Sequence, residues 1–84
     1  MRRLNEIENP TKKILFLGYD ETKTNLIDAL INKNCLVDHT EQKIYKINEY
    51  DFVFTYGYRH ILKRDVIEEF GCPIFNLHIS YLPY

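Results

Sequence analysis

Cysteine is scarce in this chain, and a long apolar run is absent. Only Cys35 and Cys72 occur among the 84 residues, and the residues after Met1 are polar where a secretory leader would have an apolar core. The longest unbroken apolar run, residues 14–17, is far too short to span a membrane. These absences argue against a disulfide framework, and they predict a cytoplasmic, non-membrane protein whose two thiols are reduced and serve as small buried hydrophobes.

A concentration of positive charge is also missing. The formal net charge is −1, and no basic patch with interleaved aromatic residues is present to follow a phosphate backbone. Nucleic acid is therefore not an expected partner. Two well-separated cysteines cannot supply a four-ligand zinc site, and the three histidines, His39, His60 and His78, do not have short metal-ligand spacings. No metal site is expected.

The chain nevertheless has an ordinary globular composition. Hydrophobic residues make up 45% and aromatic residues 14% of it, which argues against disorder of the whole chain. The length allows one small domain. Residues 1–11 are polar and are predicted to form a flexible leader, and residues 12–84 are predicted to form the domain.

Apolar strand patterns alternate with helical patterns along the domain. Strands are predicted at residues 13–19, 35–37, 51–56 and 73–77, the first of them buried on both faces. A first helix at residues 25–33 has Leu26, Ile27, Leu30 and Ile31 on one stripe, with Asp20 or Thr22 as its N-cap. A second helix is predicted at residues 62–70, ended by Gly71, and residues 41–50 are predicted to form a compact turn. This order indicates an α/β fold: a Rossmann-like, four-stranded parallel sheet with flanking helices.

Polar residues gather where the predicted strands end. Segments 18–20, 57–60 and 76–84 would all lie beyond the carboxyl ends of the strands, where ligands bind in such sheets. Asn76, His78 and Ser80 alternate and would share one face of an extended chain. An amide can donate to a developing oxyanion, and an imidazole can move a proton near neutral pH. The alternative is that these polar groups satisfy backbone groups at the end of the strand.

Other residues near these ends also allow two interpretations. Gly18-Tyr19-Asp20 follows a strand, but it lacks the further glycines of a dinucleotide fingerprint. Arg59 and His60 suit a phosphate or a carboxylate, and equally suit a solvated loop. The tyrosines in the same segments could stack on a base or a pterin, or could pack in the ordinary way; they are Tyr56, Tyr58, Tyr81 and Tyr84.

The last part of the chain resembles a known family. The segment Asn-Leu-His-Ile-Ser-Tyr-Leu-Pro, residues 76–83, is similar to the signature Asn-x-His-x-Ser-x-Leu-Pro of formyltransferases that use N10-formyltetrahydrofolate. Residues 51–62 look like the third parallel strand of that family and the loop that cradles the pterin. The resemblance covers roughly residues 12–84. The tyrosine-rich segments are more similar to the sugar N-formyltransferases than to the other branches.

The resemblance implies a role for each matching residue. Asn76 would donate to the formyl oxygen, and His78 would transfer a proton or stabilise the charge on that oxygen. The formyl donor would be held by Tyr58, Arg59, His60, Ile61 and Leu62. The acceptor, a nucleotide-linked amino sugar, would contact Ser80, Tyr81 and Tyr84. Methionyl-tRNA or another amine is the alternative acceptor, and no metal is implied.

One catalytic residue of the family has no counterpart in the 84 residues. The family's third catalytic residue is an aspartate well downstream of the signature, and neither Asp51 nor Asp65 matches its position. The resemblance therefore implies a truncated N-terminal domain, in which residues 12–84 are a partial catalytic domain with little or no activity alone. A homodimer formed through regions outside these residues is one option. The other functional alternatives are a non-catalytic folate- or ligand-binding or oligomerisation α/β module and a generic α/β structural domain.

Overall fold

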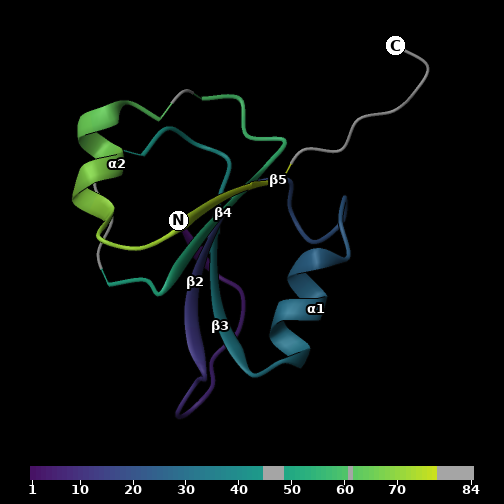
Figure 1. Cartoon of the computed structure of the whole chain (residues 1–84). Helices are drawn as coiled ribbons and strands as arrows, with labels where there is room; N and C mark the ends of the chain where they lie inside the picture. Colours follow the sequence, from purple (N-terminus) through teal and green to yellow (C-terminus); the bar gives the residue numbers. More distant parts are fainter. Residues whose placement is uncertain (45–48, 61, 78–84) are drawn as a thin grey trace.

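The chain forms a mixed five-stranded sheet with two helices in a computed structural model that describes residues 1–44, 49–60 and 62–77 (Figure 1). The elements are β1 Arg2–Arg3, β2 Lys12–Gly18, α1 Leu26–Asn32, β3 Cys35–Thr40, β4 Phe52–Tyr56, α2 Arg64–Phe70 and β5 Ile74–Leu77. The strand order is β1-β3-β2-β4-β5, with β1 antiparallel to β3 and the other pairs parallel. The α/β fold is therefore confirmed, while the sheet is mixed and not purely parallel as predicted.

The central strand β2 is buried on both faces, as its unbroken apolar run predicts. Ile14 and Phe16 contribute to one core cluster, and Leu15 and Leu17 contribute to the other. All four side chains are at most 2% exposed. Because β2 pairs with β3 on one side and β4 on the other, its backbone groups are satisfied while both faces stay apolar.

The two helices lie on opposite sides of the sheet (Figure 1). In α1, Ile27 is fully buried, and Leu30 and Ile31 pack against the same cluster as Phe16. The predicted stripe is wrong at Leu26, which begins the helix and is 38% exposed. On the other side, Val66 of α2 packs against the cluster of Leu15, Leu17 and Val53, together with Leu62. Leu62 precedes the helix, which begins at Arg64.

The start of α1 differs from the predicted capping. Its N-cap is Asn25, without a side-chain cap hydrogen bond, so the prediction of Asp20 or Thr22 is wrong. The Asp20 carboxylate instead accepts hydrogen bonds from the backbone N–H and the hydroxyl of Thr22, at 3.0 and 2.5 Å. These bonds lower the pKa of Asp20. They form a local turn that competes with helix capping. Gly71 ends α2 in a left-handed conformation, as predicted.

The strand β1 is an addition that the sequence pattern does not predict. Arg2 pairs with His39, and Arg3 pairs with Asp38. The contact continues beyond β1: the backbone N–H of Leu4 donates to the Val37 carbonyl at 2.9 Å. The Asn5 amide exchanges hydrogen bonds with the backbone at Cys35 and Val37. Residues 2–5, expected in a flexible leader, thus lie along β3. Polar residues can join a sheet in this way because the pairing uses backbone groups, which sequence periodicity does not reveal.

The neighbouring strands β4 and β5 have two chemically different faces. One face carries an aromatic cluster, in which the ring centroids of Phe54 and Phe75 are 5.3 Å apart and those of Phe52 and Phe75 are 5.8 Å apart. The opposite face carries Val53 and Ile74 in the core cluster under α2. Alternation along the two strands places Thr55 and Asn76 on this second face. The polar residues that end the strands therefore lie on the α2 side of the sheet.

Candidate functional site

The candidate site lies at the carboxyl ends of the parallel strands, next to the point where the strand order reverses. From β2 the chain passes through α1 to β3 on one side, and then crosses to β4 on the other side. Segments that leave β2 and β4 therefore diverge and leave room between them, which is where ligands bind in open α/β sheets. Several cavities lie at this edge of the sheet, and two of them are lined by predicted site residues.

The first cavity, the Asn76 cavity, has a volume of about 280 Å³. Its lining comes from β4, β5, α2 and the segment that follows β4: Thr55, Tyr58, His60, Leu62, Ile67, Ile74 and Asn76. The lining combines aliphatic side chains, the Tyr58 ring and the polar side chains of Thr55, His60 and Asn76. A pocket of this kind suits a flat, largely apolar ring with hydrogen-bonding groups at its edge.

Thr55 fixes the orientation of the Asn76 side chain. The two residues are partners in the ladder between β4 and β5, and the Thr55 hydroxyl donates to Asn76 Oδ1 at 2.9 Å. Thr55 is buried, whereas Asn76 is exposed. With Oδ1 engaged, the remaining hydrogen-bonding group of Asn76 is the Nδ2 donor, which has no partner among the described residues. The sheet thus presents an amide donor at the edge of a cavity.

Tyr58 is held in place by contacts at both ends. Its hydroxyl donates to the Gln42 carbonyl at 2.8 Å, and its ring makes an edge contact with His60, with ring centroids 5.4 Å apart. Burial raises the pKa of Tyr58 above its ordinary value. Because its hydroxyl is already engaged, what Tyr58 offers to a ligand in the Asn76 cavity is the ring.

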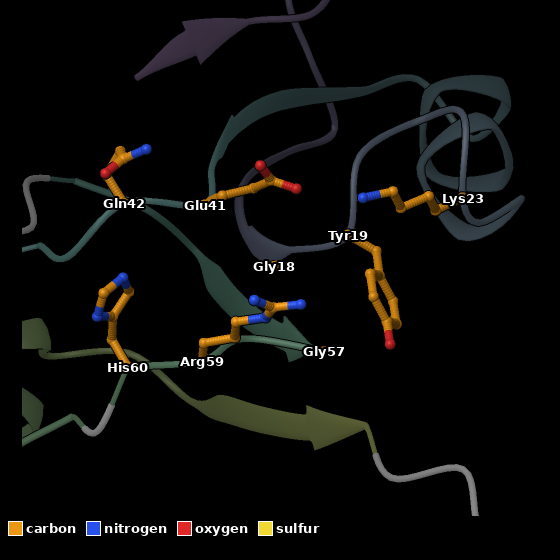
Figure 2. A pocket seen from close by; sticks show the side chains of 8 residues that line it. All are labelled: Gly18, Tyr19, Lys23, Glu41, Gln42, Gly57, Arg59 and His60. Atoms are coloured by element: carbon orange, nitrogen blue, oxygen red, sulfur yellow. The ribbon is translucent and has the colours of Figure 1, made fainter.

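The second cavity, the Gly18 cavity, has a volume of about 360 Å³ and is more polar (Figure 2). The segment after β2 contributes Gly18, Tyr19 and Lys23. The segment after β3 contributes Glu41 and Gln42, and the segment after β4 contributes Gly57, Arg59 and His60. His60 therefore lines both cavities.

The structure brings some of the predicted site residues together and separates others. Asn76, Tyr58, His60 and Leu62 line the Asn76 cavity. Arg59, predicted to act with the same group, lines the Gly18 cavity. The other predicted site residues, Ile61, His78, Ser80, Tyr81 and Tyr84, lie outside the described residues. Tyr56, a stacking candidate, packs against the core and makes an edge contact with Tyr19.

A polar network around Asp38 was not predicted from the sequence. The buried Asp38 carboxylate accepts hydrogen bonds from Arg3 Nε at 3.0 Å and from the Tyr50 hydroxyl at 2.5 Å. The Asp38 hydrogen bond raises the pKa of Arg3. The signal available in the sequence is that Asp38 and His39 directly follow the apolar residues 35–37, so that a longer strand would bury them.

His39 is the second buried member of this region. Its Nε2 lies 2.8 Å from the carbonyl oxygen of Gly18, and its Nδ1 lies 3.1 Å from Arg2 Nη2. A carbonyl only accepts and a guanidinium only donates, so Nε2 carries the proton and Nδ1 accepts. His39 therefore links β1 to Gly18 at the end of β2, and Gly18 lines the Gly18 cavity.

Tyr50 offers a test of this network through alkaline unfolding. Burial, and then the hydrogen bond to Asp38, raise the pKa of Tyr50 well above its ordinary value of 10.0. A raised pKa in the folded state stabilises the protein fully below the unfolded pKa and progressively less as the pH rises above it. Between pH 9 and 11 the native chain should therefore lose stability faster than Tyr50→Phe. Urea unfolding at each pH measures this, and parallel curves for the two proteins would contradict it.

The two cysteines are free, as predicted. Cys35 is buried in the core cluster under α1, and Cys72 is half-buried against the other cluster. Burial raises the pKa of the Cys72 thiol, which makes its reactive thiolate form less populated.

Searches against protein-family models, curated proteins and solved structures gave no match to this chain. Among the described residues, no helix is both long and apolar enough to cross a membrane. Within the same residues, no group of three or more His, Cys, Asp or Glu side chains is arranged to hold a metal ion.

Proposed function

We propose that the chain is part of an N10-formyltetrahydrofolate-dependent formyltransferase that acts on the amine of a nucleotide-linked amino sugar. The observation that carries the proposal is the fixed Asn76 amide at the edge of the Asn76 cavity. Its Oδ1 is held by Thr55 at 2.9 Å, so its Nδ2 is the group left to donate. The signature that begins at Asn76 implies formyl transfer, and the Asn76 cavity offers a binding site for the formyl donor beside this amide.

The lining of the Asn76 cavity fits the formyl donor. Leu62, Ile67 and Ile74 give apolar walls, and the Tyr58 ring gives an aromatic surface for a pterin. When bound, N10-formyltetrahydrofolate supplies the formyl group that the acceptor amine takes up. Tyr58, His60 and Leu62 would hold its ring system beside Asn76.

Asn76 and His78 divide the chemistry in this proposal. Nδ2 of Asn76 donates a hydrogen bond to the formyl oxygen as negative charge builds up there, which lowers the barrier most if the donor is already oriented. Thr55 provides that orientation. His78 keeps the role implied by the signature, which is to move a proton or to stabilise the same charge. Tyr81, Ser80 and Tyr84 remain the proposed contacts to the acceptor.

A non-catalytic folate- or ligand-binding module is the second candidate, and one observation favours it. Among the described residues, the Asn76 cavity has no carboxylate in its lining. The family's chemistry uses an aspartate beside the histidine. Without it, the cavity would still bind the pterin but would not transfer the formyl group at a useful rate.

Binding of a stable folate derivative tests what the two candidates share. Folinic acid should bind the 84-residue chain saturably, as followed by two-dimensional NMR with shifts of the Thr55 and Asn76 amides. Ile67 lines the cavity but is 43% exposed, so Ile67→Asn should weaken binding about tenfold or more, from the loss of apolar contact, without unfolding the chain. Glu68→Asp, at the next position of α2 and outside the lining, is the control and likewise leaves the net charge unchanged.

The outcomes separate the candidates. Folinic acid binding without formylated product, detected by mass spectrometry with N10-formyltetrahydrofolate and a nucleotide amino sugar, is expected for these 84 residues under either candidate. Product formed by a longer chain that supplies the aspartate would support the enzyme. The absence of saturable binding at millimolar folinic acid, or equal weakening by both α2 substitutions, would remove both.

A further inference from the structure

The Gly18 cavity contains two cationic side chains that are not paired with a carboxylate. Within the described part of the chain, ion pairs join Arg2 to Glu21 and Arg3 to Asp38, but none involves Lys23 or Arg59. Asp20, whose carboxylate is engaged by Thr22, acts on Lys23 only over a longer range. A cavity with two such cations favours an anionic ligand.

The two cations come from opposite sides of the cavity. Lys23 belongs to the segment between β2 and α1, and Arg59 belongs to the segment after β4. Figure 2 shows the ammonium of Lys23 and the guanidinium of Arg59 both directed into the space beside Gly18 and Tyr19. A guanidinium can give two parallel hydrogen bonds to a phosphate, and an ammonium adds a further charged donor. Together they would hold a phosphate between the ends of β2 and β4.

Glu41 lines the same cavity and narrows the choice of ligand. Its carboxylate points toward the same space in Figure 2. In the described residues it nevertheless forms no ion pair with Lys23 or Arg59. A carboxylate only accepts hydrogen bonds. A bare anion would leave it without a donor and would be repelled by it, whereas a ligand with both a phosphate and hydroxyl groups would satisfy all three side chains.

Two glycines line the cavity at positions where a side chain would clash. Gly18 and Gly57 both have positive φ, at 115° and 66°. A Cβ atom on Gly57 would overlap the ring of Tyr19, so no side chain fits there unless that ring moves. The resulting volume of about 360 Å³ is in the range of pockets for small molecules.

We propose that the Gly18 cavity binds a sugar phosphate, with the phosphate between Lys23 and Arg59 and a sugar hydroxyl donating to Glu41. The proposal concerns binding alone and does not rest on formyl transfer at the Asn76 cavity. The positive charge selects the phosphate, and the carboxylate selects a ligand that also carries hydroxyl groups.

Calorimetric titration of the full chain at low ionic strength tests the proposal with three ligands: glucose 1-phosphate, inorganic phosphate and glucose. Glucose 1-phosphate should bind more tightly than either of the others. Lys23→Gln and Arg59→Gln should each weaken its binding at least about tenfold, the effect of losing charged hydrogen bonds. Glu41→Gln should bring the affinities for glucose 1-phosphate and inorganic phosphate closer together, because it removes the acceptor and the repulsion at once.

Two further variants control for the loss of charge. Lys33→Gln removes a cation at the end of α1, before β3 begins, and Arg64→Gln removes one at the start of α2. Neither residue lines the Gly18 cavity, so both should leave the affinity for glucose 1-phosphate within about twofold of the native value. NMR shifts of the Gly18 and Gly57 amides should locate the ligand.

Three results would overturn the proposal. They are undetectable binding of glucose 1-phosphate at millimolar concentration, equal affinity for inorganic phosphate, and equal losses in the control and cavity variants. Folinic acid binding is measured separately and is tested at Ile67, which does not line the Gly18 cavity. Failure of the sugar phosphate site with folinic acid binding intact would leave the proposed function standing, and the reverse result would leave this site standing.

Discussion

Gly18→Ala should destabilise the chain by about 3 kcal/mol, since strained backbone and forced close contact each cost about 1–3 kcal/mol. Gly18 has a φ of 115°, which side-chain-bearing residues rarely adopt. Its new Cβ would fall on the Tyr56 carbonyl oxygen and lie 2.9 Å from the Tyr58 backbone nitrogen. That oxygen already accepts the Tyr19 N–H at 2.8 Å, so the backbone cannot move aside without losing a hydrogen bond.

Gly71→Ala is the matched control for backbone strain alone. Its φ of 64° is also positive, but a Cβ there would meet nothing within 4 Å. The cost should be about 1–2 kcal/mol, that of a left-handed residue with a side chain. Thermal unfolding should show a fall of about 12–24 °C for Gly18→Ala, from about 4–8 °C per kcal/mol in a domain of this size. Equal shifts for the two variants would mean that the contact with Tyr56 can be relieved cheaply.

If the proposed function holds, Asn76→Ala should reduce formyl transfer about 100- to 1,000-fold, or about 3–4 kcal/mol, in a longer form that carries the downstream aspartate. The physical reason is the loss of a donor that Thr55 orients toward a single role. Turnover with N10-formyltetrahydrofolate and a nucleotide amino sugar measures the effect. The midpoint of thermal unfolding, taken on the same variant, should move little because Asn76 is exposed and, among the described residues, its side chain bonds only to Thr55.

Thr55→Val separates positioning from chemistry. It retains the shape of residue 55 but removes the hydroxyl that holds Asn76 Oδ1. Turnover should fall by less than in Asn76→Ala, because the amide is still present but is no longer oriented. If Asn76 instead serves only to satisfy the strand end, both variants would keep near-normal turnover and lose about 1–3 kcal/mol of stability. That result would make the signature an accident of sequence.

Much of the fold could be predicted because buried strands and helix ends require recognisable residue patterns. Residues 14–17 form one apolar run since β2 is buried on both faces, and Gly71 marks the end of α2 because it adopts a left-handed conformation. β1 could not be predicted in this way. Arg2 and Arg3 join the sheet through backbone pairing and through side chains that meet Asp38 and His39, and such long-range polar pairing leaves no local periodicity.

The sequence predicted where the candidate site lies better than it predicted which residues line each cavity. The rule that ligands bind beyond the carboxyl ends of parallel strands pointed to the segments after β2, β4 and β5. Which side chains share a cavity depends on how these segments turn. The sequence neighbours Tyr58 and Arg59 line different cavities. Lys23 and Glu41, which are far apart in the sequence, line the same cavity.

The pairing between β4 and β5 has a consequence for how faithfully the site can be assembled. In the described sheet β5 is the outermost strand, held by β4 alone, and its side chains alternate between the aromatic face and the α2 face. A slip of one residue would reverse this parity. Asn76 would turn onto the aromatic face, and Phe75 would take its place opposite Thr55. The stacking of Phe75 on Phe54, with ring centroids 5.3 Å apart, therefore stabilises the register in which the Asn76 amide lies at its cavity.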